Sequence, residues 1–372
     1  MRILSIVGTR PQLIKAAALS PALRSQHDEI LVDTGQHYDE AMAGAFFSEL
    51  GLARPHHSLG VGGGTGIGQT AAMLSRLEPV IEREHPEAVL LYGDTNSTLA
   101  GALAGAKAGL PVAHVEAGLR SFDRRMPEEV NRVVADHLSR WLFAPTDAAV
   151  ANLAAEGITE GVALVGDLMR DLAARIAPDV RDPAALDEVA GVGPALTPGG
   201  YLFATIHRAG NREPGAIRAW AGLLRKVARP DRPVVLALHP GTLATLDVAG
   251  EALGSDVVVT GPLGYRASLT LQLHAAAVLT DSGGVQREAG WLGVPCLVLR
   301  DTTEWVELLA ESGGRMSLVG LDGDQAAAEL AHWAPIDAGR SIAAARAEHL
   351  SIEPAGAAAA ITERLGAGTS TR

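Results

Sequence analysis

Residues 112–132 read VAHVEAGLRSFDRRMPEEVNR, and this stretch indicates both a fold class and a candidate site. Val112 to Val115 form a near-continuous apolar run, which is typical of a buried strand in a parallel sheet. The chain then breaks at Gly118 into a loop dense in acidic and basic side chains, which include the arginine cluster Arg120, Arg124 and Arg125. Open α/β sheets place their ligand sites at loops that follow the carboxyl ends of parallel strands. Carboxylate and guanidinium groups together in such a loop predict acid–base chemistry on an anionic substrate.

The composition fits a globular protein with aliphatic cores. The chain has 372 residues, 47% of them hydrophobic but only 4% aromatic, and this length predicts about two or three domains. The formal charge of −12 argues against binding to nucleic acid or to an anionic membrane, because no broad basic field would attract a polyanion. The single cysteine, Cys296, excludes an internal disulfide. The sequence has no signal-peptide pattern and no apolar run of membrane-spanning length, so we expect a cytoplasmic protein.

Short apolar strands alternate with helical segments along the chain, which predicts parallel sheets built from βαβ units. The expected strands are Ile3–Val7, Ile30–Thr34, Ala88–Tyr92, Val112–Val115, Trp141–Ala144, Tyr201–Thr205, Pro233–Leu238, Val257–Thr260, Ala277–Thr280 and Pro295–Leu299. The expected helices include Pro11–Ser25, Gln69–His85, Thr98–Ala108, Glu128–His137, Thr146–Glu156, Pro214–Ala228, Leu269–Ala276 and Ala355–Leu365. Residues 178–199 are expected to connect two domains.

The two halves of the chain repeat one pattern. Residues 89–116 run strand, GDTNS, helix, GLP, strand and acid, while residues 278–304 run strand, DSGGVQ, helix, GVP, strand and acid. Two similar α/β domains that face each other across a cleft would explain this repeat. Clefts between domains are favoured ligand sites.

Two turns of the first half carry candidate site residues. The sequence GTRP at residues 8–11 opens a helix whose free N–H groups would bind a phosphate, and Arg10 and Lys15 add positive charge. An ordinary β–α turn with surface charges is the alternative interpretation. Asp94 follows another strand, where it serves as an acid or base, or merely caps the next helix.

The opening segment adds two further carboxylates. Glu116 and Glu128 lie on either side of the loop, so both could face one pocket, and Arg132 falls about one turn after Glu128. A helix start would also explain Pro127–Glu129, since proline suits the first turn and acids suit the positive end of the helix dipole. It does not explain Glu116, which follows a buried strand.

The second half offers groups suited to a nucleotide. His207 and Arg208 follow a strand, where they could contact a diphosphate, although a lone histidine is more often structural. Backbone N–H groups of a DSGG turn before a helix form a phosphate cradle, with a simple tight turn as the alternative. The cradle residues are Ser282, Gly283 and Gly284. Glu288, about one turn into that helix, is placed to accept hydrogen bonds from ribose hydroxyls. The histidines lack the spacing of a metal site, so no metal is expected.

These motifs together resemble the non-hydrolysing UDP-N-acetylglucosamine 2-epimerase family. GTRP, GDTNST, HVEAGLR, PEEVNR, HR and DSGG occur in this order over nearly the whole chain, and the combination is highly specific. The resemblance implies a glycosyltransferase-B type α/β fold with two Rossmann-like domains and an active site between them. It implies an N-terminal domain of residues 1–170 plus 355–372, completed by a returning C-terminal helix, and a UDP-binding domain of residues 171–354. It also implies a homodimer that needs no metal or nicotinamide cofactor.

Carried over by motif, the resemblance assigns a role to each candidate residue. The implied catalytic residues are Asp94, Glu116, Glu128 and His207. The implied substrate and UDP contacts are Arg10, Lys15, Arg132, Arg208, Ser282, Gly283, Gly284 and Glu288. The implied reaction interconverts UDP-N-acetylglucosamine and UDP-N-acetylmannosamine by elimination of UDP to a 2-acetamidoglucal and its re-addition. A carboxylate would remove the C2 proton and an acid would return it to the other face; which carboxylate is the base stays open.

The sequence departs from the commonest bacterial pattern. Tyr38 and Asp39 follow His37 where allosterically regulated members carry Arg and Gln, and the segment 61–68, VGGGTGIG, lacks their basic residue. We therefore expect no allosteric UDP-N-acetylglucosamine site. The loop between Glu116 and Glu128 is shorter than usual and reads FDRR at residues 122–125. It resembles the subgroup that epimerises UDP-2,3-diacetamido-glucuronic acid, and its arginines could pair with a uronate. That substrate is an alternative, as are a hydrolysing epimerase, a glycosyltransferase of the same fold and a non-catalytic nucleotide-sugar sensor. The three carboxylates argue against the sensor.

Overall fold

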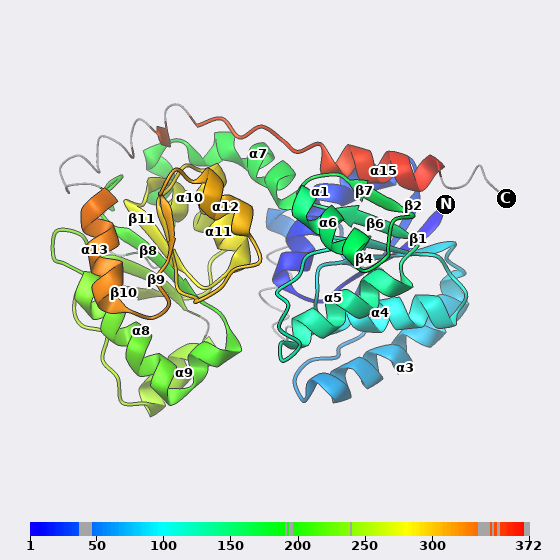
Figure 1. The fold of residues 1–372 in the computed structure, drawn as a ribbon, viewed down its shortest axis with the longest axis horizontal. Coiled ribbons are helices and arrows are strands. Elements are labelled where there is room, and N and C mark those ends of the chain that lie inside the picture. The colour runs from blue at the N-terminus through cyan, green and yellow to red at the C-terminus, as the bar shows by residue number, and fades with distance from the viewer. Residues whose placement is uncertain are drawn as a thin grey trace. The chain divides into compact units, whose positions relative to one another are not determined.

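The computed structural model describes residues 1–36, 47–189, 192, 196–238, 240–333, 343, 346–347 and 350–367. The chain divides into two compact units, of which unit 1 is Met1–Leu172 with Glu353–Arg372 and unit 2 is Ala173–Ile352. Each unit contains one parallel β-sheet with helices packed against it (Figure 1). His37, Tyr38 and Asp39, on which the expected absence of an allosteric site partly rests, lie outside the described residues.

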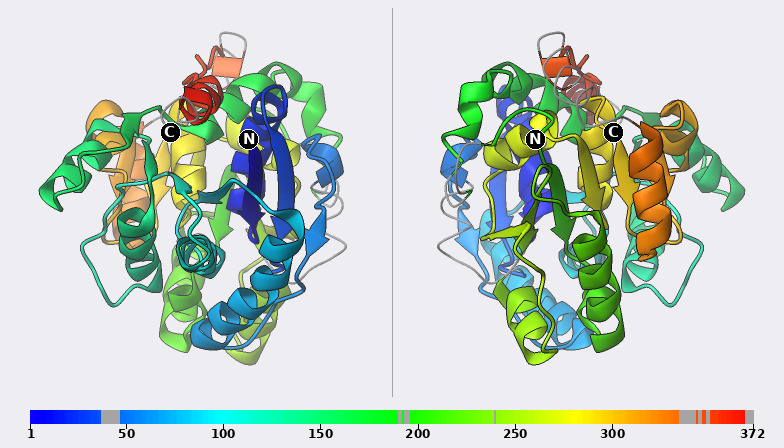
Figure 2. Two further views of the ribbon diagram at one scale, coloured as in Figure 1. Left: turned by 90° about the vertical axis from the view of Figure 1, so that its right-hand side faces the viewer. Right: turned by 90° about the vertical axis from the view of Figure 1, so that its left-hand side faces the viewer.

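Unit 1 holds a seven-stranded sheet in the order β3-β2-β1-β4-β5-β6-β7. The strands are β1 Arg2–Val7, β2 Asp28–Asp33, β3 His57–Ser58, β4 Ala88–Tyr92, β5 Val112–Val115, β6 Trp141–Ala144 and β7 Val162–Leu164. In the register of the sheet, Leu4 lies between Ile30 and Val89, and all three side chains are buried. The parallel pair β1 and β2 is visible in dark blue in Figure 2. The strand order reverses between β1 and β4, which makes the carboxyl ends of these strands a topological switch point.

The helices of unit 1 return the chain to the start of each strand. They are α1 Arg10–Arg24, α3 Gly66–Glu84, α4 Asn96–Lys107, α5 Pro127–Leu138, α6 Asp147–Ala155 and, from the C-terminal segment, α15 Ala357–Ala367. Helix α15 packs against α1, in red beside dark blue in Figure 1. Asp171, on α7 Leu168–Val180, accepts hydrogen bonds at 2.9 Å from the amides of Gly356 and Ala358. The carboxylate thereby satisfies otherwise unpaired N–H groups at the start of α15.

Unit 2 repeats the same topology with six strands in the order β10-β9-β8-β11-β12-β13. The strands are β8 Leu202–Ile206, β9 Val234–Leu238, β10 Val257–Thr260, β11 Ala277–Thr280, β12 Cys296–Val298 and β13 Met316–Leu318. The order again reverses beside the first strand, between β8 and β11, as it does between β1 and β4. The repeated strand–helix–strand pattern in the sequence therefore corresponds to β4-α4-β5 in unit 1 and β11-α11-β12 in unit 2.

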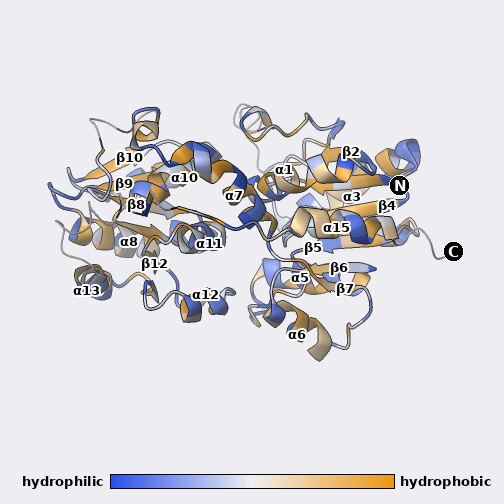
Figure 3. Ribbon diagram, turned by 90° about the horizontal axis from the view of Figure 1, so that it is seen from above, coloured by the Kyte–Doolittle hydropathy of each residue, from blue (hydrophilic) through white to orange (hydrophobic). Residues whose placement is uncertain are grey.

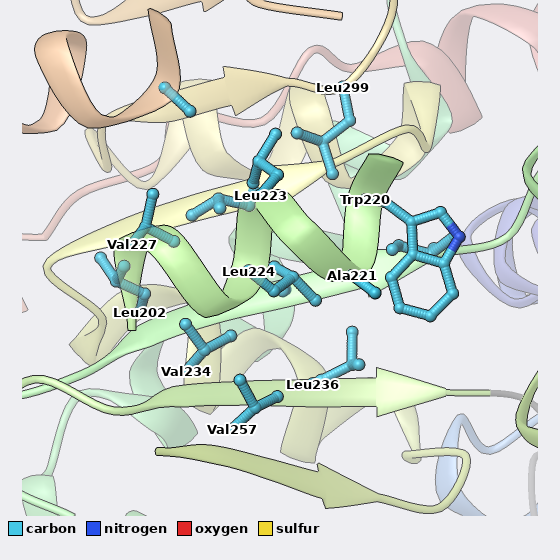
Figure 4. Close-up of a cluster of buried hydrophobic side chains, with 14 of the residues drawn as sticks. Leu202, Trp220, Ala221, Leu223, Leu224, Val227, Val234, Leu236, Val257 and Leu299 are labelled. Carbon is cyan, nitrogen blue, oxygen red and sulfur yellow. The ribbon is translucent and has the colours of Figure 1, made fainter. Parts of the chain in front are cut away.

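An aliphatic core under α8 supports the sheet of unit 2. The helical elements are η1 Pro183–Leu186, η2 Ala209–Arg212, α8 Pro214–Val227, α9 Pro240–Val248, α10 Tyr265–His274, α11 Gly283–Trp291, α12 Val306–Glu311 and α13 Gly323–Trp333. Trp220 and Leu224 of α8 pack over the strands among Leu202, Leu236 and other fully buried residues (Figure 4). Hydrophobic residues run along the strands of both sheets in Figure 3, as expected for parallel strands covered on both faces.

Two general features of the described residues bear on function. No helix among them is both long and apolar enough to cross a membrane. Nor do they contain a group of three or more His, Cys, Asp and Glu side chains arranged to hold a metal ion. Cys296 is fully buried in β12, and burial raises the pKa of its thiol far above the ordinary value. Such a thiol is inert because the reactive thiolate is strongly disfavoured.

Candidate functional site

The switch point of unit 1 holds a buried ion pair. Lys15, on α1, pairs with Glu116, which directly follows β5, and their side chains are only 6% and 10% exposed. Gly93, after β4, packs against this pair: a Cβ there would lie 3.2 Å from Lys15 Nζ and 3.3 Å from Glu116 Oε2. The backbone of Glu116 has φ +73°, a conformation that costs a non-glycine residue energy and is often found at functional sites. The local structure thus fixes the Glu116 carboxylate beside a cation.

A second carboxylate–cation pair joins the turn after β4 to α5. Arg132, on α5, donates hydrogen bonds to Asp94 Oδ2 through Nη2 at 2.6 Å and Nε at 3.1 Å. Asn131 Nδ2 donates to the Asp94 carbonyl oxygen at 2.8 Å. Asp94 remains 32% exposed at its side chain while Arg132 is buried. Because Asp94 adjoins Gly93, the turn after β4 carries the Asp94 carboxylate and also packs against the Glu116 carboxylate.

Two neighbouring glutamates of α5 have different environments. Glu128 is exposed in the first turn of the helix and pairs with none of the residues that the structure describes. Glu129, which the sequence did not single out, is buried and accepts hydrogen bonds from the amides of Ser121 and Phe122 at 2.8 and 3.0 Å and from Arg132 at 2.9 Å. Burial raises the pKa of Glu129, but these hydrogen bonds outweigh it and leave the pKa below its ordinary value. Glu129 therefore holds the loop, and Glu128 is open to a ligand.

The loop between β5 and α5 separates arginines that the sequence grouped together. Arg120 is buried and donates to Asp136 and to Glu156, each at 2.7 Å, so it belongs to the interior and not to a substrate-facing cluster. Arg125 is 91% exposed at its side chain and pairs with Asp123 at 2.8 Å, which lowers the pKa of that carboxyl to about 2. Arg124 is also exposed. The exposed cationic groups of this loop are thus Arg124 and Arg125.

The start of α1 corrects one sequence-based expectation. The amides of Gln12 and Leu13 both donate to the Thr9 carbonyl oxygen at 3.0 Å, and Pro11 has no N–H. The Gln12 side chain in turn accepts from the Thr9 amide at 3.2 Å, which completes a capping arrangement. The helix start therefore does not offer the predicted row of free N–H groups to a phosphate. An anion at this turn would depend on Arg10, since Lys15 is already paired.

The start of α11 in unit 2, unlike that of α1, has backbone N–H groups that could bind an anion. The amides of Gly283 and Gly284 find no acceptor among the described residues, and Ser282 Oγ accepts from the Val285 amide only at 3.5 Å. A Cβ on Gly283 would lie 2.9 Å from Glu304 Oε1, so any larger residue would require that side chain to move. Free N–H groups at the positive end of a nine-residue helix are the geometry expected of an anion cradle.

A buried aspartate fixes the second turn at this switch point. Asp281, fully buried at the end of β11, accepts hydrogen bonds from the amides of His207 and Arg208 at 2.9 and 3.0 Å and from Asn211 Nδ2 at 2.5 Å. Trp220 Nε1 also donates to the Asn211 carbonyl oxygen at 3.0 Å. These bonds bring the turn after β8 beside the start of α11. The sequence placed Asp281 in the DSGG motif but gave it no role, because its partners lie about 70 residues earlier in the chain.

The predicted nucleotide contacts differ in exposure. The side chain of His207 is exposed, and that of Arg208 is half-buried, 3.9 Å from Glu304. Burial raises the pKa of Glu304, but the hydrogen bond and charge of Arg300 outweigh it and hold the pKa below the ordinary value. Glu288 is 3% exposed, and its Oε2 accepts from Gln272 Nε2 at 2.7 Å. A ligand hydroxyl that donates to Glu288 would therefore meet a carboxylate that Gln272 of α10 already orients.

Comparison with known proteins agrees with the resemblance of the motifs. A sequence model of the family described as UDP-N-acetylglucosamine 2-epimerase matches residues 22–346. The chain is 45% identical over 315 residues to UDP-2,3-diacetamido-2,3-dideoxy-D-glucuronate 2-epimerase of Pseudomonas aeruginosa, a match that covers 83% of this chain and 86% of the relative.

Two solved structures extend the comparison to the fold. The UDP-GlcNAc 2-epimerase of Methanocaldococcus jannaschii in complex with UDP-GlcNAc and UDP has a TM-score of 0.78 and 36% identity, with 92% of this chain and 98% of that chain covered. The enzyme from Neisseria meningitidis bound to UDP-GlcNAc has a TM-score of 0.85 and 28% identity, with 99% and 100% covered. The predicted α/β fold of the glycosyltransferase-B type, with Rossmann-like strand order in both sheets, is confirmed. The chain belongs to the UDP-N-acetylglucosamine 2-epimerase family, whose members are nucleotide-sugar isomerases.

Proposed function

We propose that this chain interconverts UDP-N-acetylglucosamine and UDP-N-acetylmannosamine without hydrolysing the nucleotide sugar. The observation that carries the proposal is the pair of carboxylate–cation contacts at one turn, Glu116 with Lys15 and Asp94 with Arg132, on either side of Gly93. Inversion at C2 needs one group to remove a proton and another to return it. The UDP-GlcNAc bound in two solved relatives supports the choice of substrate.

The proposed reaction assigns the charged groups of each unit to successive steps. The C2 proton is not acidic in the intact sugar, so the C1–O bond to UDP breaks first and positive charge develops on the ring. The free amides of Gly283 and Gly284, together with Arg208, stabilise the departing diphosphate. A carboxylate from the set Asp94, Glu116 and Glu128 then removes the C2 proton to give the 2-acetamidoglucal. Protonation on the opposite face and re-addition of UDP complete the inversion.

The remaining predicted residues act as substrate contacts in this proposal. Arg10 provides positive charge for the diphosphate, while Lys15 and Arg132 contact the substrate beside the carboxylates that they pair with, Glu116 and Asp94. His207 assists at the sugar, because its exposed ring follows a strand end beside the α11 start. Ser282 and Glu288 hold the phosphate and the ribose. None of these roles requires a metal ion or a nicotinamide.

A second substrate, UDP-2,3-diacetamido-glucuronic acid, is favoured by two specific observations. The relative from Pseudomonas aeruginosa that is named for this substrate is 45% identical to the chain. In the loop after β5, Arg124 and Arg125 are exposed, and an arginine can form a bidentate pair with a uronate carboxylate. Because Arg125 already pairs with Asp123, Arg124 is the better candidate for that contact.

Product analysis tests these alternatives in one experiment. The enzyme is incubated with UDP-GlcNAc, and the sugar signals are followed by NMR and mass spectrometry. Appearance of UDP-ManNAc at constant total nucleotide sugar is the expected result. Free N-acetylmannosamine with UDP would identify a hydrolysing epimerase instead, and the absence of any product would exclude UDP-GlcNAc as substrate. A parallel incubation with the diacetamido-uronate decides between the two epimerase activities.

Assembly and regulation complete the proposal. We infer a cytoplasmic homodimer, as the resemblance to the family implies. We also infer that an allosteric UDP-GlcNAc site is absent, since residues 61–68 carry no basic side chain that could hold a second nucleotide sugar. Light scattering should therefore give about twice the 38.5 kDa mass of the chain, and initial rates should follow a hyperbola in UDP-GlcNAc. A monomeric mass would contradict the dimer, and a sigmoidal rate curve would contradict the absence of regulation.

A further inference from the structure

A fully buried histidine lies beneath the turns that present Asp94 and Glu116. His114 is in the middle of β5 and has no exposed surface. Its Nδ1 lies 2.7 Å from Asp136 Oδ1, on α5, and its Nε2 lies 2.7 Å from the carbonyl oxygen of Gly93. The ring therefore bridges α5 and the turn after β4.

The two partners of His114 determine its protonation. The Gly93 carbonyl oxygen can only accept a hydrogen bond. The Arg120 guanidinium donates to Asp136 Oδ2 and pairs with it, so Asp136 is a carboxylate and also only accepts. Both ring nitrogens must then donate, and a histidine that donates from both nitrogens is an imidazolium.

The same carboxylate holds the turn that carries Glu116. Asp136 Oδ2 accepts hydrogen bonds from the Gly118 amide at 3.1 Å and from Arg120 Nη1 at 2.7 Å. Gly93, Glu116 and Gly118 all have positive φ, at +63°, +73° and +82°. The two glycines adopt this conformation without strain, but in Glu116 it persists only where the surroundings fix it. The His114–Asp136 pair fixes both ends of this arrangement at once.

We propose that His114 is a positioning residue for the 2-epimerase reaction, held as a buried imidazolium that ties the Gly93–Asp94 turn to the Glu116–Gly118 turn. Four charged groups or pairs surround it: Asp136 on α5, Arg120 on the loop, Glu156 just after α6 and behind Arg120, and the Lys15–Glu116 pair beyond Gly93. The ring touches no substrate, because it is completely buried. Its catalytic effect rests on the proposed function, whereas its charge and its hold on the turns do not.

Two measurements test the proposal without any turnover. In the wild-type protein, ¹⁵N NMR of the histidine rings should find protons on both nitrogens of His114 near pH 7, and a neutral ring with one bare nitrogen would overturn the proposal. Hydrogen exchange at the Gly93 and Gly118 amides should accelerate in His114→Asn. Unchanged exchange at both amides would show that the ring does not hold these turns.

Kinetics then separates positioning from a general loss of stability. The amide of His114→Gln can replace Nε2 toward Gly93, while the amide of His114→Asn can replace only Nδ1 toward Asp136. We expect kcat to fall about 10²-fold in the Asn variant and about tenfold in the Gln variant, because displaced catalytic groups lose that much rate, with the Kd for UDP unchanged. Ser20→Ala, which removes a buried hydrogen bond to Glu29 elsewhere in unit 1, is the matched control. A kcat of both His114 variants equal to that of the control would overturn the proposal. An inactive wild-type enzyme would instead refute the proposed function.

Discussion

Replacing Glu116 by Gln is expected to abolish epimerisation and exchange of the C2 proton while UDP binding is retained. Gln has nearly the same shape, so it can occupy the left-handed backbone position, but it cannot accept the proton. Removing one proton-transfer group costs on the order of 10²–10⁴ in rate. The loss should appear in kcat, measured by NMR of UDP-GlcNAc turnover, and calorimetry should give a Kd for UDP close to that of the wild type.

The control for this prediction is another buried, paired carboxylate in unit 1. Glu29 accepts from Arg24 at 2.7 Å and from Ser20 at 3.0 Å, and its side chain has no exposed surface. Glu29→Gln also replaces a buried carboxylate that pairs with a cation, so it makes the same chemical change away from the switch point. If both variants kept full turnover, Glu116 would be removed from the catalytic set. If both lost turnover equally, the effect would be structural.

Replacing Arg120 by Met is expected to lower the free energy of unfolding by about 3–5 kcal/mol, because it breaks a buried ion pair with Asp136 and leaves that carboxylate only one of its two cationic partners, His114. Asp136 has no exposed side-chain surface and would lose its 2.7 Å bond, and Glu156 would lose two bonds from the same guanidinium. Urea unfolding followed by circular dichroism measures the change.

Arg125→Met in the same loop provides the comparison. Arg125 pairs with Asp123 at the surface, where ion pairs contribute little to stability. Its unfolding midpoint should match that of the wild type within error. Equal losses in the two variants would contradict the division of this loop into a buried and an exposed arginine.

Most of the fold could be predicted from apolar runs alone. Five strands, β4, β5, β6, β10 and β11, have the predicted bounds, because each is an apolar run of four or five residues that ends at a turn. The strands that were not predicted, β3, β7 and β13, have only two or three residues and are partly exposed. A segment of two or three residues is too short to show the alternation of apolar and polar residues that indicates a strand. Helix α7 was also missed; it begins in unit 1 and crosses the boundary into unit 2.

The candidate site was predictable in position but not in its pairings. Strand-end turns in the sequence located Asp94 and Glu116 correctly at the switch point of unit 1. Nothing local indicates that Lys15 pairs with Glu116 or that Arg132 pairs with Asp94, because these partners are about 100 and 38 residues apart. For the same reason the sequence grouped Arg120 with the exposed arginines and overlooked Glu129 and Asp281. Their burial depends on the packing of whole elements.

Incorporation of solvent deuterium tests the central claim most directly. The claim is that carboxylates at the β4 and β5 strand ends remove and return the C2 proton of a UDP-linked 2-acetamido sugar. After incubation of the wild-type enzyme with UDP-GlcNAc in D₂O, the account predicts UDP-ManNAc with deuterium at C2. The epimer formed with its original C2 proton fully retained would contradict it.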